Sequence, residues 1–236
     1  MPAHHNDHVP PPAGIDEFTA DAVLPRHRHR HGYASVVLSG KFTEASFSGL
    51  MPAEPGDVLL HGRFDCHCDY GQGGARKIQL LRLEWIHDDI EGHFRIGDPD
   101  ELVRIAERDP KAAMETLACN MRPAPATNPH WTHGLSTALR REEPLSLQDW
   151  AARAGVRPEA LSRGFRRYFG ASPKRYRLEA RSRRAWQEIV RSRRTLTAIA
   201  HEFGFADLAH LSRSIRAFTG APPSAWRASV KTGQTD

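Results

Sequence analysis

The chain has 236 residues, with 33 Lys and Arg, 28 Asp and Glu and 14 His, which gives a formal net charge of +5. This length predicts one or two domains, each able to bury a core. No apolar run approaches the roughly 18 to 20 residues of a membrane span, and the N-terminus lacks the apolar segment of a signal peptide. The three cysteines are too few for a disulfide framework, so we expect a soluble, cytoplasmic protein with no membrane partner.

The net charge conceals two regions of opposite sign. Residues 1–139 carry 13 Lys and Arg against 19 Asp and Glu, whereas residues 140–236 carry 20 against 9. Histidine is divided in the other sense, because 12 of the 14 precede residue 140. The sequence therefore predicts two domains with different roles.

Both ends of the chain are polar. Residues 1–14, MPAHHNDHVPPPAG, are rich in proline and have no apolar periodicity, so we expect a disordered tail there. Residues 231–236 are predicted to form a second disordered tail.

Residues 25–42, PRHRHRHGYASVVLSGKF, alternate in polarity as a β-strand does. The alternation places three histidines and a tyrosine on one side, namely His27, His29, His31 and Tyr33. Gly40 is expected to end this strand pair. Residues 54–70, EPGDVLLHGRFDCHCDY, then contain a Pro-Gly-Asp turn, a strand, and a second strand that carries His67.

These segments resemble the two short motifs of the cupin family, which implies a small cupin-like β-barrel for residues 15–97. The matching positions are His27, His29 and Gly40 in the first motif, and Pro55, Gly56, Asp57 and His67 in the second. Tyr33, however, stands where the metal-binding cupins have glutamate. The resemblance implies that this barrel is a sensor domain.

The resemblance predicts that His27, His29 and His67 bind a divalent metal (Zn, Fe or Mn), because imidazoles on adjacent strands can converge on one ion. The alternative is that they only line a ligand pocket, or remain from a metal-binding ancestor, and the missing glutamate favours this alternative. Cys66 and Cys68 are candidate substitutes for the lost ligand. They alternate with His67 along a strand, so these three side chains are not expected to point into the barrel together.

Residues 98–121 are predicted to form two short helices, the second with Asp109 as N-cap and Pro110 in its first turn. One face of the second helix is apolar and consists of Met114, Leu117, Ala118 and Met121. This face is expected either to pack against the barrel or to form a homodimer contact. The prolines that follow indicate a linker, so residues 98–128 form a helical segment and linker.

The C-terminal region contains a repeat. Residues 161–173, LSRGFRRYFGASP, return as residues 211–223, LSRSIRAFTGAPP, and seven of the 13 aligned positions are identical. Upstream of each copy lie an N-cap, apolar residues at helical spacing and a glycine turn, and the second helix begins at Pro158 or Asp207. The expected N-caps are Ser146 and Thr195. Each copy therefore belongs to a helix-turn-helix unit.

The second helix of each unit is amphipathic. The stripes expected to face the core are Leu161, Phe165 and Tyr168 in one unit, and Leu211, Ile215 and Phe218 in the other. Between the units, residues 173–191 are predicted to form one long helix that buries Tyr176, Ala180, Trp186 and Ile189. Such a helix is roughly 28 Å long. This length would suit two second helices in successive major grooves of DNA, which lie roughly 34 Å apart.

Residues 146–228 resemble the DNA-binding domain of the AraC/XylS family of transcription regulators. The resemblance is carried by SLQDWAARAGVRPEALSRGFRRYFGASPKRY and LTAIAHEFGFADLAHLSRSIRAFTGAPPSAW. Ile215 and Thr219 depart from it, because the family usually has aromatic residues there. The resemblance to this family implies a double helix-turn-helix domain over residues 129–230, with double-stranded DNA as its partner.

The exposed faces of the two second helices, with two further arginines, are the predicted DNA interface. Its predicted residues are Glu159, Ser162, Arg163, Arg166, Arg167, Arg175, Arg194, Leu208, Ala209, Ser212, Arg213 and Arg216. The resemblance assigns base contacts to Arg163 and Arg213. Arg175 and Arg194 are expected to contact phosphates, and Leu208 and Ala209 are expected to meet thymine methyl groups.

The two resemblances predict an α+β protein with a cupin-like barrel and an all-α DNA-binding domain. We expect a sequence-specific transcription regulator whose barrel senses a small molecule or a metal. The alternative is an enzyme, either a cupin-type metal-dependent oxygenase or a methyl-accepting repair protein. Such repair proteins use four cysteines and this chain has three, while Tyr33 argues against a complete oxygenase metal site. No catalytic residue is therefore predicted.

Overall fold

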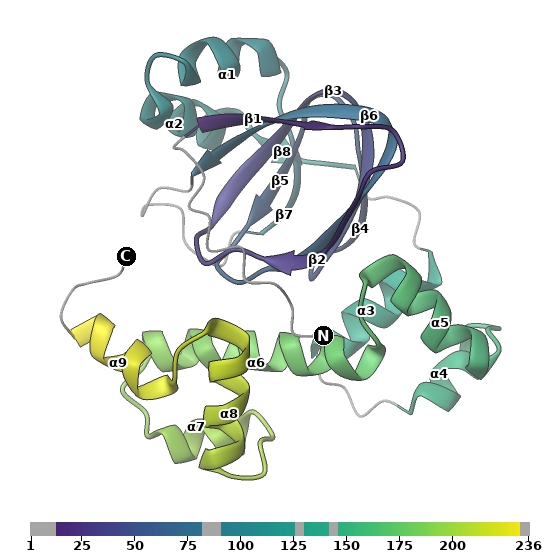
Figure 1. Ribbon diagram of the computed structural model, residues 1–236, viewed down its shortest axis with the longest axis vertical. Coiled ribbons are helices and arrows are strands. Elements are labelled where there is room, and N and C mark those ends of the chain that lie inside the picture. The colour runs from purple at the N-terminus through teal and green to yellow at the C-terminus, as the bar shows by residue number, and fades with distance from the viewer. Residues whose placement is uncertain (1–12, 82–90, 126–129, 142–145, 232–236) are drawn as a thin grey trace. The chain divides into compact units, whose positions relative to one another are not determined.

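The computed structural model of the protein describes residues 13–81, 91–125, 130–141 and 146–231. It shows a mixed α+β chain with an N-terminal antiparallel sheet and C-terminal helices (Figure 1). The chain divides into two compact units. The first consists of Met1–Thr137 and Leu147–Ser172, and the second of Ala138–Ser146 and Pro173–Asp236. The domain boundary predicted at residues 128 and 129 lies outside the described residues.

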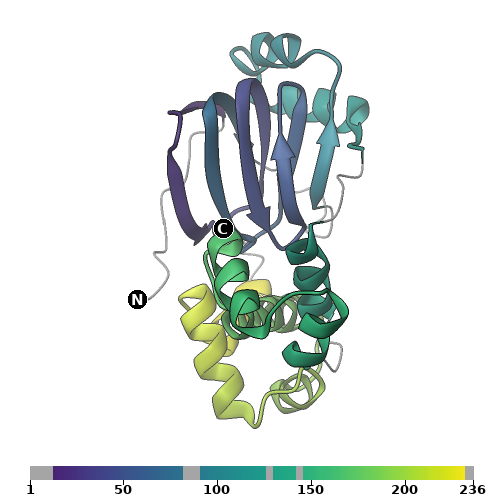
Figure 2. The same cartoon turned by 90° about the vertical axis from the view of Figure 1, so that its right-hand side faces the viewer.

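The sheet has eight strands within the described part of the chain. They are β1 (Ala13–Phe18), β2 (Val23–Arg28), β3 (Tyr33–Ser46), β4 (Gly49–Ala53), β5 (Asp57–His61), β6 (Cys66–Leu81), β7 (Gly92–Arg95) and β8 (Arg122–Pro123). Their order is β1-β6-β3-β5-β7-β8, with β2 paired to β6 and β4 paired to β3 (Figure 2). This path of paired strands does not return on itself among the described residues. The predicted cupin-like barrel is thus not closed.

The long strands β3 and β6 run side by side through two halves of the sheet. In one half they are flanked by β5 and β1, and in the other by β4 and β2. The register between them shifts on both sides of Ser39 and Gly40. Such irregularities bend strands and increase their twist. The bend separates the two halves while keeping both on the same pair of strands.

Gly40 lies inside β3, so the prediction that it ends the strand is wrong. Its φ is +74°, and a Cβ placed on it would lie 1.7 Å from the carbonyl oxygen of Gly74 on β6. A side chain at this position is therefore excluded both by the backbone conformation and by the neighbouring strand. The glycine allows β3 to bend without leaving the sheet.

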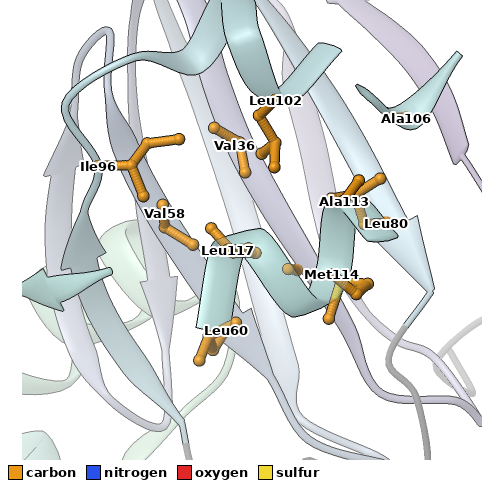
Figure 3. Packing of buried hydrophobic residues seen from close by; sticks show 11 residues of the cluster. Val36, Val58, Leu60, Leu80, Ile96, Leu102, Ala106, Ala113, Met114 and Leu117 are labelled. Carbon is orange, nitrogen blue, oxygen red and sulfur yellow. The ribbon is translucent and has the colours of Figure 1, made fainter. Parts of the chain in front are cut away.

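Helices α1 (Pro99–Ala106) and α2 (Pro110–Asn120) cover the sheet, and Asp109 caps α2 as predicted. Met114 and Leu117 of α2 are buried against sheet residues (Figure 3). Their neighbours in this cluster include Val36, Val58, Leu60 and Leu80. The apolar face of α2 therefore packs on the sheet, which was one of the two predicted roles. The homodimer contact stays a prediction.

The remaining helices follow the predicted repeat. They are α3 (Trp131–Arg141), α4 (Leu147–Arg153), α5 (Pro158–Phe169), α6 (Pro173–Arg191), α7 (Leu196–Glu202), α8 (Leu208–Thr219) and α9 (Pro223–Lys231). The bounds of α6 are those predicted, and Thr195 caps α7 through its side chain. Both second helices, α5 and α8, end on a left-handed glycine, Gly170 or Gly220. None of these or the other described helices is long and apolar enough to cross a membrane.

Two expectations about ordering and burial need correction. Ala13 and Gly14 belong to β1 and Lys231 to α9, so the predicted tails are wrong at these positions. The rest of both predicted tails lies outside the described residues. In α5, Phe169 is fully buried and Tyr168 only partly, because helical positions seven and eight residues after Leu161 are nearly equivalent. The stripes predicted for α6 and α8 are buried.

Thr219 replaces an expected aromatic residue with a hydrogen-bond network. Its hydroxyl accepts from Trp226 Nε1 at 2.7 Å and lies 2.9 Å from the carbonyl oxygen of Ile215. A buried hydroxyl and a buried indole N–H each need a partner, and here each satisfies the other. The departure from the family pattern thus links α8 to α9.

Gly40→Ala should destabilise the protein more than Gly73→Ala. Gly73 also has a positive φ, of +106°, but a Cβ there would meet nothing within 4 Å. Backbone strain alone should cost about 1–3 kcal/mol at Gly73. At Gly40 the overlap with Gly74 should add about 1–3 kcal/mol or more. Urea denaturation measures both free energies of unfolding, and equal losses would show that the close approach to β6 is unimportant.

Candidate DNA interface and histidine cluster

The predicted DNA-contacting side chains lie on the exposed faces of α5 and α8. The exposed residues are Glu159, Ser162, Arg163, Arg166 and Arg167 on α5, and Leu208, Ala209, Arg213 and Arg216 on α8. Ser212 is half-buried. In the described part of the chain, the guanidinium groups of Arg163 and Arg213 form no ion pair. Both are therefore free to bind phosphates or base edges.

The two arginines predicted to contact phosphates are instead held by carboxylates. Arg175 Nε lies 2.7 Å from Glu179 Oε1, one turn along α6. Arg194 forms ion pairs with Glu188, at 3.6 Å, and with Glu202. These pairs offset the positive charge that would attract a phosphate. A phosphate contact at either residue stays a prediction.

Three histidines form a cluster, which consists of His27 on β2, His67 on β6 and His29 directly after β2. The pairing of β2 with β6 sets His27 opposite His67, and their ring centroids are 4.2 Å apart. The ring of His29 lies 5.0 Å from that of His27 and 5.5 Å from that of His67. The structure thus brings together the three predicted metal ligands, with one donor atom of each within 4.8 Å of the others. Among the described residues, two groups of side chains have donor atoms close enough together to hold a metal ion, and His31 belongs to neither of them.

The electrostatics of the three rings suit metal binding. Burial lowers the pKa of His27 and of His67, and it lowers the pKa of His29 to about 3. The rings are therefore neutral at pH 7, which is the form of imidazole that binds a metal. Tyr33, in the position of the missing glutamate, places its hydroxyl 3.0 Å from His67 Nε2. The donor set thus fits a divalent ion without help from Tyr33.

Sequence analysis missed two members of the cluster, Glu44 and His61. His61 lies opposite Tyr33 in the pairing of β3 with β5, and their rings stack with centroids 4.4 Å apart. His61 Nδ1 is 3.1 Å from Asp65 Oδ2, and its Nε2 is 3.2 Å from Glu44 Oε2. Burial alone would lower the pKa of His61, but the charges of Glu44 and Asp65 outweigh it and raise the pKa to about 10. Tyr33 was predicted to share a strand face with the histidines, and a residue opposite Tyr33 on the next strand faces the same side of the sheet. This alternation was the sequence signal available for His61.

The comparisons with known proteins concern the helical region. Residues 150–229 match the family described as Helix-turn-helix domain. The transcriptional regulator GbdR of Pseudomonas aeruginosa is 33% identical over 93 residues, which are 39% of this chain and 25% of that protein. The chain thus spans a quarter of the length of such relatives. An AraC-type regulator structure from Chromobacterium violaceum is 30% identical, with 42% of this chain and 91% of that chain covered and a TM-score of 0.39.

A wider structural comparison spans both regions of the chain. ToxT from Vibrio cholerae covers 92% of this chain and 97% of its own, at 8% identity and a TM-score of 0.43. The family match, by contrast, coincides with the two helix pairs and the long helix between them. Residues 150–229 are a helix-turn-helix domain of the matched family. The domain thus begins within α4 and ends within α9.

The first helix pair of the helix-turn-helix domain touches the sheet through the C-terminal end of α5. Tyr70 Oη donates to the carbonyl oxygen of Arg167 at 2.7 Å. Cys68 Sγ lies 3.2 Å from the carbonyl oxygen of Tyr168, and Arg26 Nη1 donates to that of Phe169 at 3.2 Å. These carbonyls belong to the last turn of the helix, where the backbone donors that would continue the helical ladder run out. Three side chains of β2 and β6 therefore cap α5.

The capping side chains alternate with the histidines along their strands. Arg26 precedes His27 on β2, and Cys68 follows His67 on β6. Adjacent strand residues point to opposite faces, so the thiol is directed away from the cluster and is no substitute ligand. Burial raises the pKa of Cys68 to about 11, and burial also raises the pKa of Tyr70, so both groups keep their protons.

Tyr70→Phe should loosen the end of α5. A single hydrogen bond contributes about 0.5–1.5 kcal/mol net, so amide exchange in the last turn of α5 should become roughly 3–10-fold faster. Hydrogen exchange read by mass spectrometry measures this. Tyr168→Phe is the matched control, since it removes a hydroxyl from α5 but keeps all three contacts with the sheet. Unchanged exchange in Tyr70→Phe would show that the hydrogen bond does not hold the helix.

Proposed function

We propose that the protein is a sequence-specific transcription regulator that binds double-stranded DNA through its AraC-type domain. The observation that carries the proposal is the pair of arginine-bearing faces on α5 and α8, repeated in sequence and exposed in both units. The charge supports it, because residues 140–236 carry 20 Lys and Arg against 9 Asp and Glu. A basic domain attracts the phosphate backbone, and a helix of this kind fits the major groove.

The two faces offer different kinds of DNA contact. We assign base contacts to Arg163 and Arg213, which can each bind O6 and N7 of a guanine. Leu208, which is 39% exposed, and Ala209 suit thymine methyl groups. Ser162 and Ser212 suit a base or a phosphate, and Glu159 suits a cytosine amino group. We assign the phosphate contacts to Arg166, Arg167 and Arg216. Arg175 and Arg194 would contact phosphates only when their ion pairs with carboxylates open.

We further propose that the sheet senses an effector, either a small molecule or a metal. A metal would bind at the histidine cluster, with His27, His29 and His67 as the ligands predicted from sequence. A small polar molecule has another candidate site, a cavity of about 690 Å³ beside α1 and α2. Its charged and polar lining residues include Arg95, Asp98, Glu101, Asn120 and Arg122. The contacts of Arg26, Cys68 and Tyr70 with α5 are the proposed route from sensor to DNA.

Arg163→Ala and Arg213→Ala should each relax base preference at one half-site. Loss of a bidentate guanine contact should cost about 1–3 kcal/mol and affect only the half-site that the arginine reads. The two half-sites should lie about 10–10.5 base pairs apart, as α6 would space them. Binding-site selection on the full chain measures the preference.

Arg166→Ala is the matched control on the same face of α5, and it should lower affinity for every sequence about equally. If Arg163→Ala and Arg213→Ala behave in the same way as this control, both arginines bind phosphates and the base contacts belong to other residues. If the wild-type chain selects no sequence, the proposed function is wrong.

The affinity of the full chain for its selected site should fall steeply with salt. With six to ten phosphate contacts, released counterions predict a loss of roughly 10³–10⁵ in affinity between 50 and 200 mM salt. Fluorescence anisotropy with a labelled duplex measures the slope. Lys111→Ala, an exposed cation on α2, should leave the slope unchanged. Salt-independent binding would contradict the proposed interface.

A further inference from the structure

We propose that the sheet holds a divalent transition metal of the Zn²⁺ class through the carboxylate of Glu44 and the imidazoles of His61 and His67. One donor atom of each residue lies within 4.8 Å of the others. Small side-chain rotations would bring all three to the ~2.0–2.2 Å of a bound ion. The site deepens the sensing role proposed above, and it depends on that role only for the claim that the metal is the effector.

Glu44 gives an independent reason to expect a ligand. Its side chain is 1% exposed, and its Oε1 has no hydrogen-bond partner. Nδ1 of His67 is likewise buried without a partner. Unsatisfied polar atoms in a protein interior are costly, and for a carboxylate the cost is especially high. A cation placed among these groups would satisfy both residues at once.

The neighbours of the two histidines orient them as metal ligands are oriented. Asp65 Oδ2 lies 3.1 Å from His61 Nδ1, and Tyr33 Oη lies 3.0 Å from His67 Nε2. Histidines that bind metals usually donate their other ring N–H to an oxygen of this kind, which fixes the ring. His67 thus has Nε2 held by Tyr33 and Nδ1 left for an ion. His61 Nε2 lies 3.2 Å from Glu44 Oε2, so an ion bound between these two ligands would displace the proton of His61.

Glu44 supplies the carboxylate that the sequence motif lacks. The motif has Tyr33 at its glutamate position, but the bend in β3 brings Glu44 of the same strand to the cluster. Two imidazoles with one carboxylate suit Zn²⁺ or Fe²⁺ and leave coordination positions open. A set of three imidazoles, His27, His29 and His67, shares His67 with this group but offers no negative charge to a divalent ion.

The test is a metal titration of the full-length protein after removal of bound metal with a chelator. Zn²⁺ is added in competition with a chromophoric chelator, and elemental analysis gives the stoichiometry. We expect the wild-type protein to bind one equivalent of Zn²⁺. We expect Glu44→Gln and His61→Gln to weaken Zn²⁺ binding by about 100-fold or more, which exceeds the 10–100-fold loss typical of residues that only hydrogen-bond a metal ligand. Glu17→Gln and His93→Gln are the matched controls, on the same sheet but outside the group, and should keep wild-type affinity.

Two outcomes would overturn the ligand assignment. One is a wild-type protein that binds none of Zn²⁺, Fe²⁺ and Mn²⁺. The other is full affinity in Glu44→Gln together with loss of metal in His27→Gln and His29→Gln, which would assign the ion to the three imidazoles. If Glu44→Gln does not fold by circular dichroism, X-ray absorption on the zinc-loaded wild type decides instead. Two imidazoles with a carboxylate support the site, whereas three imidazoles without one reject it.

DNA binding by the same preparations separates this site from the proposed function. Metal binding that fails while sequence-specific DNA binding persists overturns the site alone. Stoichiometric Zn²⁺ that leaves DNA affinity unchanged supports the site and rejects the metal as effector. A change of at least about tenfold in DNA affinity, lost in Glu44→Gln but kept in Glu17→Gln, supports both and corresponds to a typical coupling between two sites.

Discussion

The pairing of β3 with β6 determines which side chains meet inside the sheet. Its register sets Glu44 opposite Asp69, while β2 on the other edge of β6 sets His27 opposite His67. A shift by one residue would exchange the two faces of β6, moving His67 out of the cluster and Cys68 into it. The histidine cluster is therefore a consequence of backbone register. The bend at Gly40 completes it, because one strand can then contribute residues from both halves of the sheet.

The two helix-turn-helix units share their geometry but differ in what stabilises it. Both second helices end on a left-handed glycine whose N–H donates to the backbone carbonyl oxygen of the arginine four residues earlier. Just before that glycine the first unit buries Phe169, which stacks on Phe165. The second unit has Thr219 at the equivalent place and satisfies its hydroxyl through Trp226. Apolar burial in one unit is thus replaced by hydrogen bonding in the other, so the two units respond differently to substitution at this position.

Features that depend on local interactions were predictable from sequence, and those that depend on distant pairing were not. The bounds of α6 and the caps Asp109 and Thr195 follow from residues a few positions apart, and all were predicted. Gly40 was misinterpreted because a glycine in a turn and one in a bent strand look alike until Gly74 is placed beside it. Glu44 and His61 were missed because a short motif records spacing along one segment. Their meeting requires β3, β5 and β6 to pair first.

The energies involved suit a link between the histidine cluster and α5. Neighbouring residues of β6 face opposite ways, so His67 lies in the cluster while Cys68 reaches the last turn of α5. Three side chains contact the carbonyl oxygens of that turn, and hydrogen bonds contribute about 0.5–1.5 kcal/mol each. Their sum, on the order of a few kcal/mol, is comparable with the 1–3 kcal/mol of typical coupling between two sites. A shift of β6 that weakens these contacts would therefore change the freedom of α5 by a useful amount.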